Sequence, residues 1–85
     1  MIKKIEYRVT SQVNGLIVKE VFSSLQGAQK EARLIDRPSM LSATVTYFDG
    51  LERSGELFVY NSMDTCFEIN SRFLDLVKYY SKKLK

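Results

Sequence analysis

The dipeptide Asn14-Gly15 stands between two stretches of alternating polar and apolar residues, and it constrains the fold more than any other feature of the chain. Alternation with a period of two is typical of β-strands. A two-residue type I′ turn needs positive φ at both central positions, which Asn and Gly tolerate. The sequence therefore predicts a hairpin with three facing pairs: Val13 and Leu16, Val9 and Glu20, Tyr7 and Phe22.

One face of this hairpin is apolar, and the other is mostly polar. The polar face nevertheless carries Ile17 and Val21, with Arg8 and Lys19 beside them. An apolar centre with a charged rim is typical of protein interfaces, although two isolated apolar residues on a sheet surface are also common. Glu20 falls on the apolar face, which predicts a bulge or an edge strand at that position.

A helix is predicted after the hairpin. Ser23 can cap it, with Gln26 as the capping-box partner. Apolar residues then recur every three or four positions and define one buried stripe: Leu25, Ala28, Ala32 and Ile35. Pro38 ends the helix. The small alanine side chains allow this helix to lie close against the apolar face of the hairpin.

Alternation returns at residues 41–48 and predicts a third strand, followed by strands at 56–60 and 65–69. A tight turn at Asp49-Gly50 would place Val45 opposite Ser54, so a longer loop through Gly55 is expected. Residues 61–64 form the next turn. Asn70 or Ser71 then caps a final helix, whose predicted apolar stripe is Phe73, Val77, Tyr80 and Leu84, with Leu76 beside it.

The predicted order is β-β-α-β-β-β-α, an α+β fold with one antiparallel sheet and two helices packed on one face. A chain of 85 residues has room for one hydrophobic core, so residues 1–85 are expected to form a single domain.

Residue types that carry chemistry are scarce. The sequence has no histidine and one cysteine, so neither a zinc site nor a Cys-His nucleophile can be assembled within it. Its glycines match neither phosphate-binding nor dinucleotide-binding motifs. We therefore expect no catalytic residues, no cofactor and no metal, and a protein that acts by binding. Cys66 follows a strand pattern beside Phe67, which predicts a buried thiol.

The sequence shows no apolar signal-peptide stretch and no apolar run near the ~20 residues of a membrane span. A lone cysteine is unusual in small secreted domains, which depend on disulfides. A cytoplasmic protein without membrane contact is expected.

Positive charge is concentrated in the final helix, where five basic residues between positions 72 and 85 accompany one acidic residue. Cations near a helix C-terminus are favoured by the helix dipole, and the same cluster can also contact a polyanion. Tyr79 lies outside the apolar stripe and could stack on a base. The candidate nucleic-acid-binding residues are Arg72, Lys78, Tyr79, Lys82, Lys83 and Lys85.

The residues that we favour as a binding site are expected to contact protein rather than nucleic acid. Four of them lie on the polar hairpin face: Arg8, Ile17, Lys19 and Val21. Phe58 and Tyr60 follow, on the outer face of the third and fourth strands. This second group depends on the strand register, because the opposite register would place both rings in the core.

The order α-β-β-β-α from Ser23 onward resembles the double-stranded RNA-binding domain. That family has a lysine cluster at the start of its last helix, where this chain has Asn70-Ser71-Arg72-Phe73. The chain is also similar to small phage or mobile-element inhibitors of the anti-CRISPR type, in its hairpin, its helix from Ser24 to Ile35 and its strand pair between Ser42 and Tyr60. This resemblance implies an inhibitor or adaptor, monomeric or homodimeric, that docks on a larger nucleic-acid-handling protein or ribonucleoprotein complex.

Overall fold

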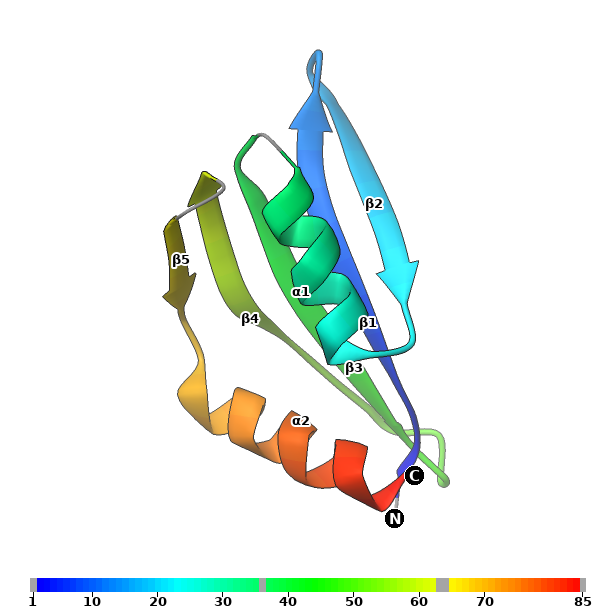
Figure 1. The fold of residues 1–85 in the computed structure, drawn as a ribbon. Helices are drawn as coiled ribbons and strands as arrows, with labels where there is room; N and C mark the ends of the chain where they lie inside the picture. Colours follow the sequence, from blue (N-terminus) through cyan, green and yellow to red (C-terminus); the bar gives the residue numbers. More distant parts are fainter. Residues whose placement is uncertain (1, 36, 63–64, 85) are drawn as a thin grey trace.

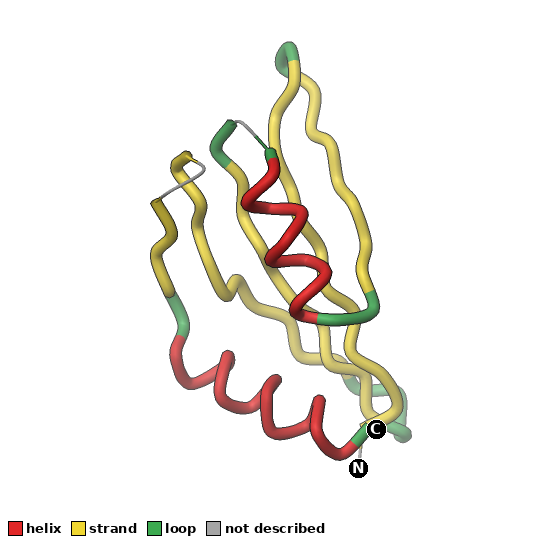
Figure 2. Tube along the Cα trace, in the orientation of Figure 1, coloured by secondary structure: helices red, strands yellow, loops and turns green. Residues whose placement is uncertain are grey.

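Five antiparallel strands form one sheet in the computed structural model, and two helices lie on one of its faces (Figures 1 and 2). The model describes residues 2–35, 37–62 and 65–84. The predicted α+β class and element order are confirmed. In chain order the elements are β1 (Ile2–Val13), β2 (Leu16–Phe22), α1 (Leu25–Leu34), β3 (Ser39–Tyr47), β4 (Glu52–Ser62), β5 (Thr65–Glu68) and α2 (Ser71–Lys83).

The β1–β2 hairpin has the predicted turn and register. Asn14 and Gly15 adopt φ values of 52° and 81°, as a type I′ turn requires. All three predicted facing pairs are present. The strand order is β2-β1-β3-β4-β5, so β2 is an edge strand, and its position explains why Glu20 can stay exposed there. The hairpin tip extends beyond the helices (Figure 1). Leu16 at this tip is therefore 72% exposed.

The core lies between the sheet and the helices. Its largest side chains with almost no exposed surface are Tyr7, Tyr60, Leu41, Leu57 and Leu74. Helix α1 presents the predicted stripe to β1 and β3, with Ala28 and Ala32 fully buried. Ser24, not Ser23, is its N-cap, since the Ser24 hydroxyl accepts a hydrogen bond from the Gly27 amide at 3.0 Å. The predicted capping box is therefore wrong.

The predicted long loop after β3 is also wrong. The strands are joined by a short turn at residues 48–51, and Thr46 already faces Glu52. Gly55 lies inside β4, where an added Cβ would sit 2.9 Å from the Phe73 ring. The alternation of β4 is reset by a bulge opposite Leu41 and Ser42, which buries two consecutive residues, Leu57 and Phe58.

Helix α2 begins after Asn70, whose side chain accepts a hydrogen bond from the Phe73 amide at 3.1 Å. Phe73 and Val77 are buried as predicted, but Leu84 is 44% exposed at the helix end. Cys66 is exposed, contrary to expectation, because β5 is the second edge strand. The predicted turn at residues 61–64 lies partly outside the described residues, since positions 63 and 64 are not described.

Candidate functional site

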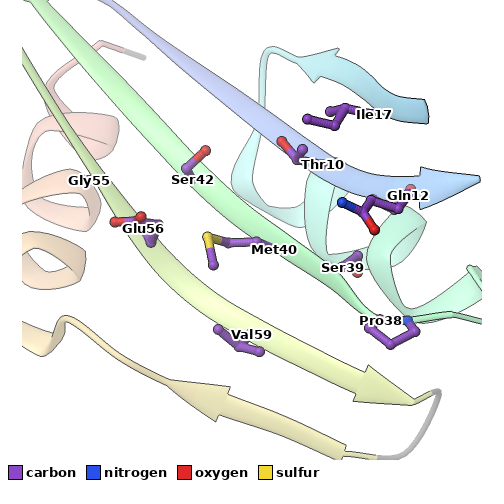
Figure 3. A pocket seen from close by; sticks show the side chains of 11 residues that line it. Thr10, Gln12, Ile17, Pro38, Ser39, Met40, Ser42, Gly55, Glu56 and Val59 are labelled. Carbon is purple, nitrogen blue, oxygen red and sulfur yellow. The ribbon is translucent and has the colours of Figure 1, made fainter. Parts of the chain in front are cut away.

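The face of the sheet opposite the helices is uncovered by any element in the described part of the chain (Figure 1). Residues alternate across each strand, so the neighbours of the core residues point to this open face. A shallow hollow of about 700 Å³ lies there, with Thr10, Met40, Glu56 and Val59 among its lining residues (Figure 3). Five antiparallel strands supply this surface, which we call the open face.

The four hairpin residues predicted to bind protein all lie on the open face. Their partners across the hairpin are Val21 for Arg8, Thr10 for Lys19 and Gln12 for Ile17. Ile17 is 71% exposed and Val21 is 54% exposed, so both aliphatic side chains are accessible to a partner. The hairpin thus brings two exposed aliphatic side chains and two cations together on one surface.

Arg8 is held against the sheet by its neighbours. Its Nη1 atom donates a hydrogen bond to Thr44 Oγ1 at 2.6 Å and lies 3.5 Å from Glu6 Oε1. The Arg8 side chain is only 19% exposed. A guanidinium fixed in this way loses little further freedom when a partner binds it.

Phe58 and Tyr60 do not belong to this surface, and their assignment as exposed binding residues is wrong. The register places Phe58 opposite Leu41 and Tyr60 opposite Ser39, on the face that the helices cover. Phe58 is 8% exposed and Tyr60 is 1% exposed. Both rings stabilise the core.

Three apolar residues on the open face were not predicted. Met40 and Val59 face each other across β3 and β4, and Phe67 on β5 faces Val59. Phe67 is 53% exposed. Their alignment follows from the strand order and from the bulge in β4, and neither leaves a signal in the local sequence.

The candidate nucleic-acid-binding residues fall into two places. Tyr79 is 57% exposed, and the Lys83 ammonium lies 5.4 Å from the centre of its ring. Phe48 and Leu84 join them around a hollow of about 510 Å³. Arg72 lies near the opposite end of α2, beside a hollow that it shares with Arg53. Lys78 and Lys82 are exposed, and Lys85 lies outside the described residues.

Titratable groups in the core are tyrosines. Burial raises the pKa of Tyr60 to about 12; the neighbouring Cys66 adds to the rise, and Arg33 and Gln29 offset part of it. No described group meets the buried Tyr60 hydroxyl with the geometry of a hydrogen bond. Burial also raises the pKa of Tyr7, and a hydrogen bond with Ser81 offsets part of that rise. Over residues 2–35, 37–62 and 65–84, no three His, Cys, Asp or Glu side chains come together as metal ligands would.

A scan of protein-family models, and searches of curated proteins and of solved structures, returned no match to this chain. In the part of the chain that is described, neither helix has the length and apolar character needed to cross a membrane.

Proposed function

We propose that this chain is a non-catalytic binding protein that docks on a larger protein through the open face. The observation that carries the proposal is the exposure of Ile17 and Val21 on a sheet face that both helices leave uncovered. Burying these two side chains in an interface removes apolar surface from water, which is the main driving force of protein association.

Charge on the same face supplies orientation. Lys19 is exposed beside the two aliphatic residues, and Arg8 is fixed by Thr44 and Glu6. Charged groups around an apolar centre select partners of complementary charge and speed their encounter. The resemblance to anti-CRISPR inhibitors adds a class of partner, a nucleic-acid-handling complex in the cytoplasm, which the protein would block by occupying one of its surfaces.

The test is affinity capture from a native host lysate with Lys19→Glu and with a matched control, Lys30→Glu. Lys30 is exposed on α1 and carries the same charge on the covered side of the molecule. We expect Lys19→Glu to lose the captured protein, Lys30→Glu to retain it, and both to melt like the parent chain. Equal capture by both variants would exclude the hairpin half of the open face as the docking surface.

Nuclease treatment of the same lysate separates this function from a second candidate, binding of nucleic acid by α2. The stacked geometry of Tyr79 and Lys83 favours the second candidate, because an exposed ring can stack on a base while the ammonium contacts a phosphate. Phosphate contacts weaken steeply between about 50 and 200 mM salt. Binding of a single-stranded oligonucleotide that falls over this range, and falls further in Tyr79→Ala, would support it.

A further inference from the structure

We propose that the open face binds a second copy of this chain, related to the first by a two-fold axis that runs nearly parallel to β3. The inference rests on the proposed function in one respect, that the open face is a protein-binding surface. It is carried by the charge pattern across the three central strands.

Two rows of residues cross the open face with the same order of charge. In one row Lys4 on β1 faces Thr46 on β3, and Thr46 faces Glu52 on β4. In the other row Arg8 faces Ser42, and Ser42 faces Glu56. Each row therefore has a cation on β1, a small hydroxyl residue on β3 and a carboxylate on β4.

A half-turn about β3 exchanges the positions of β1 and β4 and keeps each row at its own level. The rotation places Lys4 over Glu52 of the second copy, and Arg8 over Glu56 of the second copy. By symmetry each contact occurs twice. Packed sheets lie about 10 Å apart, a gap that a lysine and a glutamate side chain span together.

These carboxylates have no cation partner among the described residues, although Glu52 Oε2 accepts a hydrogen bond from Thr46 Oγ1 at 3.5 Å. Lys4 and Glu52 are separated by β3, so their strands lie about 10 Å apart. Both side chains are exposed. Among the described residues the one ion pair is that of Arg8 with Glu6, which leaves the carboxylates of β4 free to pair with another molecule.

The row between these two has Glu6, Thr44 and Ser54, and the next row beyond Arg8, toward the hairpin tip, is apolar at its centre. It runs from Lys19 through Thr10, Met40 and Val59 to Phe67. The half-turn brings Met40 against Met40 of the second copy, in the hollow shown in Figure 3. Methionine is flexible enough to fill such a hollow. The same rotation sets Lys19 over Phe67 of the second copy, which favours a cation–π contact.

Shape and area agree with this arrangement. A twisted sheet keeps its shape after a half-turn about one of its strands, so two copies stay in contact along the face. Five strands at about 4.8 Å and nine residues of β3 at about 3.3 Å give a face of roughly 700 Å². Stable interfaces bury about 800 Å² on each partner, so a reversible dimer is expected.

The experiment measures mass by sedimentation across a concentration series for the full chain, for Lys4→Glu and for Glu52→Lys. We expect the parent chain to dimerise and each variant to dissociate roughly tenfold to thirtyfold more readily, because each reversal turns two attractions into repulsions. Lys4→Glu mixed with Glu52→Lys should recover the parent affinity as a heterodimer, since both contacts are then restored. Lys30→Glu on α1 is the matched control and should dimerise normally.

A parent chain that stays monomeric at every concentration overturns the inference. So does a dimer that survives both reversals, or a mixture of the two variants that fails to recover. Thermal melts of each variant identify any loss of folding, and the recovery of the mixture requires that both are folded. If the chain is a monomer that still captures a larger protein in a Lys19-dependent manner, the dimer is refuted and the proposed function stands. If the chain is a dimer that captures no larger protein, the dimer stands and the proposed function is refuted.

Discussion

Replacing Tyr60 with phenylalanine removes one buried hydroxyl and leaves the aromatic ring in place. Tyr60 is 1% exposed, and its hydroxyl oxygen has no hydrogen-bond partner among the described residues. Leaving a polar group of this kind buried without a partner costs about 1–3 kcal/mol. We therefore expect Tyr60→Phe to raise the free energy of unfolding by about 1–2 kcal/mol.

The measurement is urea unfolding followed by circular dichroism, with the slope against denaturant unchanged and the midpoint raised. In a thermal melt, a domain of this size gains about 4–8 °C for each kcal/mol. Tyr7→Phe is the matched control, since Tyr7 is equally buried but bonds to Ser81, and its loss should cost about 0.5–1.5 kcal/mol. A destabilised Tyr60→Phe variant would show that the Tyr60 hydroxyl is bonded in solution and would refute the reasoning.

The same substitution has a signature in pH. Burial raises the pKa of Tyr60 to about 12 from an ordinary value of 10, so the folded chain keeps a proton that the unfolded chain releases. That contribution to stability is complete below pH 10 and is lost as the pH rises toward 12. The parent chain should therefore lose stability faster than Tyr60→Phe in this window. If the free energies of unfolding of the two chains changed in parallel with pH, the raised pKa of Tyr60 would be contradicted.

Three further substitutions test the fold. Gly55→Ala should cost about 1–3 kcal/mol, because the new Cβ would lie 2.9 Å from the buried Phe73 ring; unchanged stability in urea would place that ring elsewhere. Ser24→Ala should cost about 1 kcal/mol through the lost helix cap, and Ser23→Ala less than about 0.5 kcal/mol. Equal losses of stability in the two variants would show that Ser24 is not the N-cap of α1. Gly15→Ala should cost about 1–2 kcal/mol from its φ of 81° alone, since nothing lies within 4 Å of the new Cβ, and a larger loss would indicate a contact at the hairpin tip.

The parts of the fold that follow from neighbouring residues could be predicted from the sequence. The turn at Asn14-Gly15 fixes the hairpin register, because the two strands continue directly from it. The predicted cap of α1, Ser23, is one residue from the actual cap, Ser24. The two serines are chemically identical, so only the position of the first helical residue distinguishes them. The prediction for the turn after β3 considers only a two-residue turn at Asp49-Gly50, which would pair Val45 with Ser54, whereas the actual turn is one residue longer and pairs Val45 with Arg53.

One half of the candidate site could likewise be predicted from neighbouring residues, and the other half could not. Its hairpin half, with Ile17 and Val21, follows from alternation around a known turn. Its other half depends on which strands become neighbours, and β1 pairs with β3 although β2 and α1 lie between them in the sequence. The misassignment of Phe58 has this cause, because the β4 bulge reverses the face that alternation alone would give it.

The charges of the open face limit what can cover it, whichever partner does so. Cations lie on its β1–β2 side at Lys4, Arg8 and Lys19, while the carboxylates of Glu52 and Glu56 lie on β4. Glu6 is the exception on β1, and it is paired with Arg8. A partner must therefore present negative charge opposite the hairpin and positive charge opposite β4, with an apolar patch opposite Met40 and Val59 toward the hairpin tip. A second copy satisfies all three conditions at once, and a larger protein must imitate that same pattern in order to compete for the face.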